Sequence, residues 1–285
     1  MFLLIGYVIV LAASVGTFAA HGHLVALFEP LEYLAIIGLT VGGFVAGNGT
    51  KAFKATLKAI PAILRGSKYS KALYMDLFSM LYEVLAKVRK EGLMSIENDI
   101  ENVDSSPIFS KYPTVLADHH AIEFVTDYLR MMVGGNLNAF EIESLMDAEI
   151  ETHHQEAHQP AHVMAKTADA LPAYGIIVAV MGVVNVMGSV GEPPAVLGRM
   201  IGGALVGTFL GILISYGFIS PIATQLEQKA DEGGHIFAVI KAVLLASMNG
   251  YAPQVAVEFG RKVLLSTDRP TFIELEADIK ARRGR

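Results

Sequence analysis

Cysteine and tryptophan are both absent from this chain of 285 residues, and charged residues make up only 18% of it. Without cysteine the chain has no disulfide bonds and no thiol chemistry. Without tryptophan, any aromatic belt at a membrane surface must consist of tyrosine and phenylalanine. The shortage of charge is the most informative absence, because a soluble domain of ordinary composition has about 25% charged residues.

The sequence signatures of common enzymes are also missing. The chain has no glycine-rich phosphate loop, no Gly-x-Ser-x-Gly elbow, no nucleotide motif and no HExxH zinc motif. We therefore expect no enzyme activity and no bound cofactor. The net charge of -6 argues against a nucleic-acid partner, because nucleic-acid binding usually requires an excess of basic residues.

The apolar residues are concentrated in four runs that contain no Asp, Glu, Lys or Arg: 1–20, 33–50, 170–191 and 200–226. A helix needs about 20 mostly apolar residues to cross the hydrocarbon core of a bilayer. Backbone groups cannot stay unpaired in lipid, so all four runs should be helical. The first run lacks the basic residues that precede a cleaved signal, so we expect it to be retained. The predicted fold is an all-α polytopic membrane protein with four transmembrane helices and a large helical cytoplasmic domain.

The basic residues predict the orientation of these spans. Of the 22 Lys and Arg residues, 21 lie in the middle segment 51–166 or in the tail from Lys229. Positive charge stays on the cytoplasmic side, so both termini and the middle segment should face the cytoplasm. The predicted organisation is spans one and two (1–50), a cytoplasmic domain (51–168), spans three and four (169–226) and a cytoplasmic helix and tail (227–285).

The cytoplasmic domain should itself be helical. Between residues 72 and 90 one apolar stripe recurs at helical spacing, and Gly92 is placed as a helix stop. A second segment, 118–132, has the same period. The basic segment 51–65 is either an amphipathic helix on the inner membrane surface or an ordinary basic stop after a span.

The predicted spans have small residues and prolines where helices would meet. Gly203, Gly207 and Gly211 are four residues apart, which favours close helix packing within one chain or between copies. Pro172 lies in the first turn of span three, and Pro221 falls within the fourth run, where it should kink the helix and free a carbonyl. A structural and a functional role for these prolines remain equally open from the residues alone.

The four runs contain no ionisable side chain at depth, although a proton relay normally needs one. If the protein moves ions, either the spans bind a dehydrated cation through oxygen atoms or a partner supplies the titrating group. One further cluster, His153, His154, His158 and His162, includes a pair at i, i+4 spacing that could bind zinc. We interpret this cluster as a solvated polar linker rather than a metal site.

Several long strings resemble the MotA family, the stator subunits of bacterial flagellar motors, over essentially the whole chain: GYVIVLAASVGTF, SKYSKALYMDL, FEIESLMDAEIETH, DALPAYGIIVAVMGVV, LVGTFLGILISYGFISPIA and NGYAPQVAVEFGRK. The resemblance implies a proton-channel subunit of the bacterial inner membrane, located in the flagellar basal body. It implies a ring of five chains around two copies of MotB, whose membrane-embedded aspartate binds the proton. Proton flow would turn the ring against the rotor protein FliG and so drive flagellar rotation in motility and chemotaxis.

The resemblance also implies roles for individual residues. The ion pathway and its coupling would involve Pro172, Pro221 and Thr208, with the span-four residue Tyr216 beside them. Sodium-driven relatives have a threonine where this chain has Ala179, so we expect proton rather than sodium transport, with H⁺ as the transported ion. The rotor contact would be made by Arg89 and Glu97, with Lys87 and Lys90 extending the basic patch.

Three other functions are consistent with parts of this pattern. A proton-driven energiser of outer-membrane processes, of the ExbB/TolQ type, would share the chemistry of the last span but would have three spans. A self-contained solute transporter would need a polar midplane site and repeated span pairs, and neither is evident. A passive membrane scaffold would also suit glycine-spaced helices.

Overall fold

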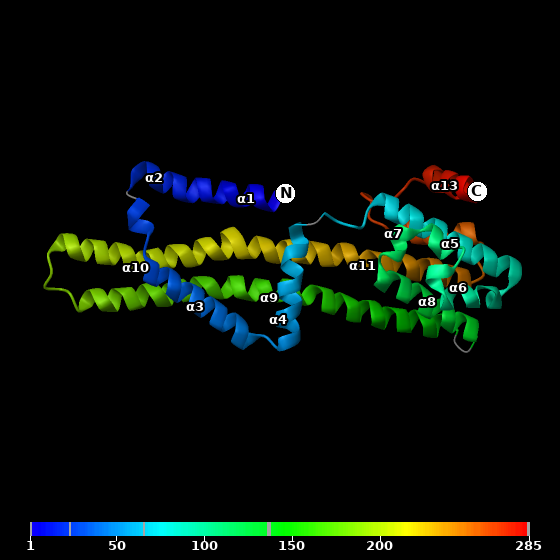
Figure 1. Ribbon diagram of the computed structural model, residues 1–285, viewed down its shortest axis with the longest axis horizontal. Helices are drawn as coiled ribbons and strands as arrows, with labels where there is room; N and C mark the ends of the chain where they lie inside the picture. The colour runs from blue at the N-terminus through cyan, green and yellow to red at the C-terminus, as the bar shows by residue number, and fades with distance from the viewer. Residues whose placement is uncertain (1, 23, 65, 136–137, 284–285) are drawn as a thin grey trace. The chain divides into compact units, whose positions relative to one another are not determined.

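A computed structural model describes residues 2–22, 24–64, 66–135 and 138–283, and every regular element among them is helical (Figure 1). The α-helices are α1 (Phe2–Leu11), α2 (Thr17–His21), α3 (Pro30–Gly47), α4 (Thr50–Ala59), α5 (Lys71–Glu91), α6 (Glu97–Glu101), α7 (Pro113–Leu116), α8 (His119–Gly134), α9 (Ala139–Met187), α10 (Pro194–Ile214), α11 (Ser220–Met248), α12 (Pro253–Val263) and α13 (Phe272–Arg283). The all-α prediction is therefore confirmed.

Shorter helical turns join these helices. Two are π-helical, η1 (Ala12–Gly16) and η7 (Ser215–Ile219). The others are 3₁₀ turns: η2 (Leu24–Leu27), η3 (Ile60–Leu64), η4 (Leu93–Ile96), η5 (Val103–Ser105) and η6 (Phe109–Lys111).

Four helical stretches among the described residues are long and apolar enough to cross a membrane: Phe2–Ala20, Leu24–Gly47, Ala139–Met187 and Pro194–Met248. The prediction of four spans is confirmed, but the helices extend beyond the charge-free runs. The second run begins at Tyr33, whereas α3 begins at Pro30 and so includes Glu32. The expectation that no span contains an ionisable side chain is therefore wrong at this position.

The chain divides into two compact units. Unit 1 comprises Met1–Gly66 and Ala157–Lys229, and unit 2 comprises Ser67–Glu156 and Ala230–Arg285. Both α9 and α11 contribute residues to each unit. Unit 1 contains the four charge-free runs, whereas unit 2 contains most of the charged residues. Arg65, the last basic residue of the predicted amphipathic segment, lies outside the described residues.

Unit 1 is built around the close packing of α9 against α10, which lie side by side in Figure 1. One apolar cluster joins Ile36 of α3 to residues of both helices: Leu171, Val178, Val206 and Leu210. On α3, Gly43 leaves room for the hydroxyl of Tyr174 on α9. Gly38, Gly42 and Gly47, in contrast, have open space around them.

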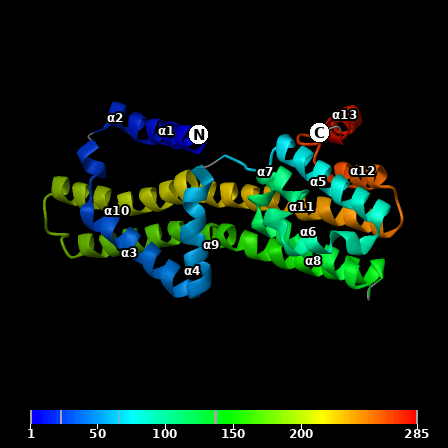
Figure 2. The ribbon, with the colours of Figure 1, turned by 45° about the vertical axis from the view of Figure 1, so that its right-hand side comes forward.

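Unit 2 has a larger apolar core, in which α5, α8, α11 and α12 all take part (Figure 2). The apolar stripe predicted on α5 forms its centre, because Leu77, Met80, Leu81 and Val84 have no exposed surface. Burying a side chain of this size contributes roughly 1.5 to 3 kcal/mol relative to leaving it exposed. The predicted helical period is therefore confirmed.

Both ends of α5 follow from local chemistry. The Ser70 side chain accepts a hydrogen bond from the Leu73 N–H, which satisfies one of the unpaired donors of the first turn. Gly92 ends the helix with φ of 87°, a conformation that favours glycine. The predicted stop at Gly92 is confirmed, and it fixes where the chain turns from α5 into η4.

The backbone also responds to Pro221. Proline lacks an N–H group, so the Gly217 carbonyl, four residues earlier, loses its intrahelical donor. The helix widens into the π-helical turn η7 over Ser215–Ile219, immediately before this proline. The distortion predicted at this point is present as a π-helical turn.

Candidate functional site

The line of closest approach between α9 and α10, which we call the α9–α10 seam, lies entirely in unit 1. It is formed by Gly175, Val178 and Gly182 on α9 and by Ala204, Gly207 and Gly211 on α10. A Cβ atom added at Gly211 would lie only 2.9 Å from the Leu171 carbonyl oxygen and from the Gly175 Cα. A larger side chain would not fit at this distance. Gly207 and Gly211 therefore pack against α9 of the same chain rather than against another copy.

Thr208 lies on this seam. Its hydroxyl is half-buried and donates a long hydrogen bond of 3.5 Å to the Gly175 carbonyl on α9. The threonine implicated in the ion pathway by the resemblance thus faces the neighbouring span. Its oxygen is one of few side-chain oxygens on the seam, whose other members are mostly glycine, alanine and aliphatic residues.

Pro172 lies one helical turn away from Gly175 and is half-buried. Because proline has no N–H group, the Ala168 carbonyl loses its intrahelical donor. The hydroxyl of Ser215, a fully buried residue of η7, donates a 2.6 Å hydrogen bond to that carbonyl. Pro172 therefore ties span three to span four through a backbone acceptor that its own ring leaves free.

The remaining membrane residues implied by the resemblance are placed differently. Ala179 follows Pro172 by two helical turns and is half-buried. Tyr216 has 62% of its surface exposed, so it does not join Thr208 on the seam. Pro221 is half-buried at the start of α11.

The residues implied as the rotor contact lie in unit 2. Arg89 is in the last turn of α5, Glu97 is the first residue of α6, and the short turn η4 separates them. Both side chains are exposed. Neither takes part in any ion pair found within the described part of the chain, so both charges face solvent. The exposed side chain of Met94 lies between them in the sequence.

The two lysines expected to extend this basic patch differ from each other. Lys87 Nζ lies 2.7 Å from a carboxylate oxygen of Asp99, whose side chain is only 3% exposed. Asp99 also accepts a 2.7 Å hydrogen bond from Ser106. Lys87 thus neutralises a buried charge and holds α5 to α6, whereas Lys90 is exposed and pairs only loosely with Glu91 at 3.5 Å.

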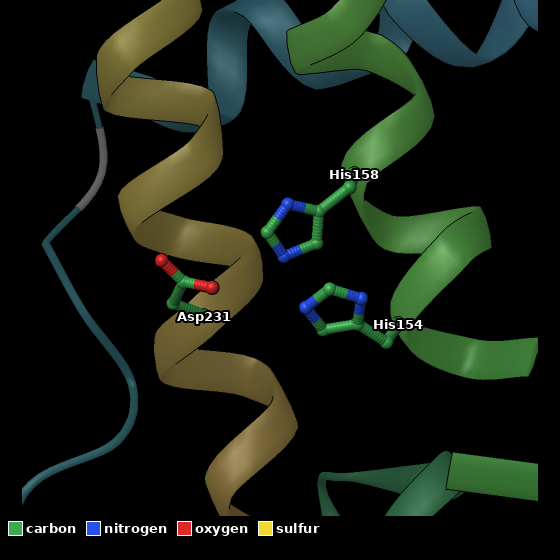
Figure 3. A group of neighbouring side chains, drawn as sticks. All are labelled: His154, His158 and Asp231. Atoms are coloured by element: carbon green, nitrogen blue, oxygen red, sulfur yellow. The ribbon is translucent and has the colours of Figure 1, made fainter. Parts of the chain in front are cut away.

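The histidine-rich segment lies on α9, where His154 and His158 are one helical turn apart (Figure 3). Within unit 2, His154 also lies near Asp231 of α11, with ligand atoms within 4.8 Å of each other. Both of these side chains are exposed, so water can satisfy them. The linker interpretation is wrong, because these histidines belong to the continuous helix α9, where the ring of His153 packs against Phe237 of α11.

Sequence reasoning missed three features of these sites. The Ser215 bond to Ala168 could have been sought, because a proline four residues after a carbonyl signals a free acceptor. The Lys87–Asp99 pair is twelve residues apart and crosses a turn, so no periodicity reveals it. Glu32 was excluded because charge-free runs were used as the limits of the spans, although Pro30 is a favoured first residue of a helix.

The fold and these surfaces define a class of protein. It is a polytopic helical membrane protein with mostly apolar, glycine-packed spans and a large unit that presents exposed charges. Residues 4–92 match the family described as motility protein A N-terminal, and residues 117–237 match the MotA/TolQ/ExbB proton channel family.

Two curated relatives are similar over nearly their whole length. The chain is 51% identical to motility protein A of Salmonella typhimurium over 285 residues, which is 100% of this chain and 97% of that protein. It is 52% identical to motility protein A of Escherichia coli K12 over 282 residues, or 99% and 96% of the two chains.

Two solved structures have the same fold. The structure of C. jejuni MotAB matches with a TM-score of 0.75 and 19% identity, covering 94% of this chain and 98% of that one. The flagellar MotAB stator complex from Bacillus subtilis matches with a TM-score of 0.71 and 25% identity, covering 96% and 98%. The first of these likenesses concerns the fold alone.

This chain belongs to the motility protein A branch of the MotA/TolQ/ExbB proton channel family. It is a multi-pass membrane subunit with the role of a stator proton channel, as predicted. The ExbB/TolQ alternative is not favoured, because the N-terminal motility protein A family and both relatives over their full length point to the flagellar branch.

Proposed function

We propose that five copies of this chain form a ring around the membrane helices of two MotB-type subunits, and that inward proton flow turns this ring against FliG. The observation that carries the proposal is the α9–α10 seam. It has Thr208 on it and Pro172 at one end, and there is no Asp, Glu, Lys, Arg or His between positions 170 and 191. A proton relay needs a titrating group, so the partner supplies it at this depth.

The distribution of charge supports a cytoplasmic position for both termini, because basic residues are confined almost entirely to the middle segment and the tail. As a stator subunit, the protein would lie in the inner membrane at the flagellar basal body. The transported species would be the proton, and this transport would involve no covalent reaction and no cofactor.

Coupling would pass through the prolines. Pro172 leaves the Ala168 carbonyl free for Ser215, and Pro221 adjoins the π-helical turn that contains Ser215. Both prolines therefore act on one junction between span three and span four. Ala179 would face the ion with a methyl group, which cannot coordinate a dehydrated Na⁺ through oxygen, so the pathway favours protons. Tyr216, which is exposed in the single chain, would contact the partner or a neighbouring copy.

The rotor contact would use Arg89 and Glu97, with Lys90 as a weaker contributor. An exposed ion pair contributes roughly 0 to 1 kcal/mol. Weak contacts of this kind suit repeated making and breaking at each step of rotation. Lys87 would act indirectly, because its pairing with buried Asp99 positions the turn that separates Arg89 from Glu97.

Assembly can be tested by expressing the chain with its MotB-type partner, purifying the complex in detergent and determining its mass by native mass spectrometry. The expected result is five copies of this chain with two of the partner. The Arg89→Glu variant is the matched control, because its exposed side chain should leave assembly unchanged. A chain that purifies without the partner, or in another ratio, would contradict the proposed assembly.

A further inference from the structure

The side chain of Glu32 points from α3 towards the α9–α10 seam. Glu32 precedes Ile36 by four residues, so the two side chains share one face of the helix. Ile36 is only 1% exposed and packs with Leu171, Val178, Val206 and Leu210 of α9 and α10. The face that buries Ile36 therefore directs Glu32 to the same two helices.

The carboxylate of Glu32 lies beside glycine positions on both of these helices. A Cβ atom added at Gly207 of α10 would lie 3.4 Å from Oε2, and one added at Gly182 of α9 would lie 3.6 Å from Oε1. A side chain at either position would therefore meet a carboxylate oxygen, so the carboxylate lies next to the seam. Thr208, whose hydroxyl reaches Gly175, is the next residue after Gly207.

The Glu32 carboxylate has no satisfying partner among the residues of unit 1 that the structure describes. None of the hydrogen bonds or ion pairs found among the described residues involves it, and its side chain is half-buried. The charge of Glu29, which acts on it, has the same sign. On α9, no Asp, Glu, Lys, Arg or His occurs between positions 170 and 187. The basic residue of α10, Arg199, borders a cavity that Glu29 lines and Glu32 does not.

An ionisable group held within a membrane span is costly when charged and usually marks an ion pathway. Glu32 is half-buried beside two glycine positions, so its carboxylate lies close to the seam while part of the side chain stays accessible to water. These features are those of a group that changes its charge during function, because protonation removes the cost of holding a carboxylate there.

We propose that Glu32 carries protons into the pathway, at the end of the seam opposite to Pro172. The carboxylate takes a proton from a hydronium ion, forming a neutral acid and releasing water. The acid then passes its proton to water beside Thr208, from which it reaches the partner's titrating group, and the carboxylate is regenerated. This inference rests on the proposed function, since it concerns the same pathway.

Glu29 provides a matched control because it is a carboxylate in the same region with a different environment. It lies against Gly203 of α10, with Oε1 3.0 Å from an added Cβ atom. It also borders a mostly apolar cavity of about 390 Å³ that includes Arg199. Among the described glycines, Glu29 is one of the three nearest neighbours only at Gly203 of α10, so it should not carry the proton.

The test uses cells that express the full chain with its partner and a pH-sensitive fluorescent protein in the cytoplasm. After external acidification, the rate of cytoplasmic acidification is measured over a range of external pH. Glu32→Gln should lower proton conduction by about tenfold or more, as loss of a proton-transfer group does. Glu32→Asp should retain much of the conduction. Glu29→Gln should also keep conducting protons, because it removes only a neighbouring charge and not the proposed carrier.

Glu32→His tests whether a loss of conduction in Glu32→Gln is only a structural effect of the substitution. Histidine restores a titratable group with an ordinary pKa of about 6.5, so conduction should return with its pH dependence shifted upward. If Glu32→Gln fails to reach the membrane, recovery in Glu32→His still supports the inference and lack of recovery overturns it.

Two results would overturn the inference while leaving the proposed function standing. One is normal conduction with an unchanged pH profile in Glu32→Gln. The other is a defect that disappears at high salt, since a carboxylate that only attracts cations is screened by added ions. If the unaltered chain and its partner conduct no protons at all, the proposed function itself fails.

Discussion

The hydroxyl of Ser215 donates a 2.6 Å hydrogen bond to the carbonyl oxygen of Ala168. This oxygen has no donor within its own helix, because Pro172, four residues further along, lacks an N–H group. Ser215 is fully buried and belongs to the π-helical turn that precedes Pro221. Both prolines therefore act on the same contact between span three and span four. A shift at one proline can reach the other through a single hydrogen bond.

Ser215→Ala should destabilise the purified complex, because it leaves the Ala168 carbonyl buried without a donor. The expected loss is about 1 to 3 kcal/mol. In Pro172→Ala, the new N–H group can pair with that carbonyl, so adding Ser215→Ala should then cost much less. Thermal unfolding of the two single variants and the double variant measures this coupling. Additive losses would show that Ser215 and Pro172 do not share the acceptor.

Pro172→Ala should insert, assemble with the partner and yet turn the motor poorly, because the seam no longer offers a free carbonyl to the neighbouring span. The measurements are membrane abundance and the rotation speed of tethered cells. Pro160→Ala is the matched control, since Pro160 lies within the same helix, α9, away from the seam. Loss of the Pro172→Ala protein from the membrane would mean that this proline is merely structural.

Arg89→Glu should impair swimming while leaving membrane insertion intact, because the exposed charge of Arg89 is free to meet a partner. Replacing attraction by repulsion changes each contact by roughly 1 kcal/mol, and the change recurs at every step. Lys262→Glu, on an exposed lysine of α12, controls for the altered net charge. A charge reversal on FliG should restore swimming, and normal motility in Arg89→Glu alone would argue against the assigned contact.

The carboxylate of Glu274 should stay ionised to low pH. Its hydrogen bonds with Lys71 and with Thr271 lower its pKa from the ordinary 4.5 to about 2. Because the folded pKa is depressed, the contact of α13 with α5 is fully favourable above about pH 4.5 and is lost as the pH falls through about 2.

An NMR titration of the Glu274 carboxyl carbon measures this pKa directly. Lys71→Ala should raise the midpoint towards 4.5, because Lys71 makes the largest contribution. Lys280→Ala, which removes a pair with Glu276 instead, should leave the Glu274 midpoint unchanged. An unchanged midpoint in Lys71→Ala would show that the pair does not form in solution.

Features that depend on local spacing were predictable from the sequence. The apolar stripe on α5, its end at Gly92 and the number of spans all follow from hydrophobic periodicity, helix-ending chemistry and run length. The spacing of Gly207 and Gly211 predicted close packing but left open whether it was internal. The structure places both against α9 of the same chain.

Features that depend on pairing across the fold were not predictable. Lys87 looks like one more exposed base in the sequence, and only the fold brings it to the buried carboxylate of Asp99. Glu32 immediately precedes a charge-free run. When the start of a span is predicted from the absence of charge alone, the prediction cannot show that the helix already begins at Pro30. Such contacts are set by tertiary packing rather than by any period.

Proton flow through these spans should drive the rotation of the motor. The most direct test is the speed of a single motor in cells whose only stator subunits are this chain and its partner, as a protonophore lowers the proton-motive force at fixed sodium concentration. With Ala179 in place of an oxygen-bearing side chain, speed should fall in step with the proton-motive force and should not change when sodium is removed. Rotation that persists on a sodium gradient after the proton-motive force has collapsed would contradict the claim.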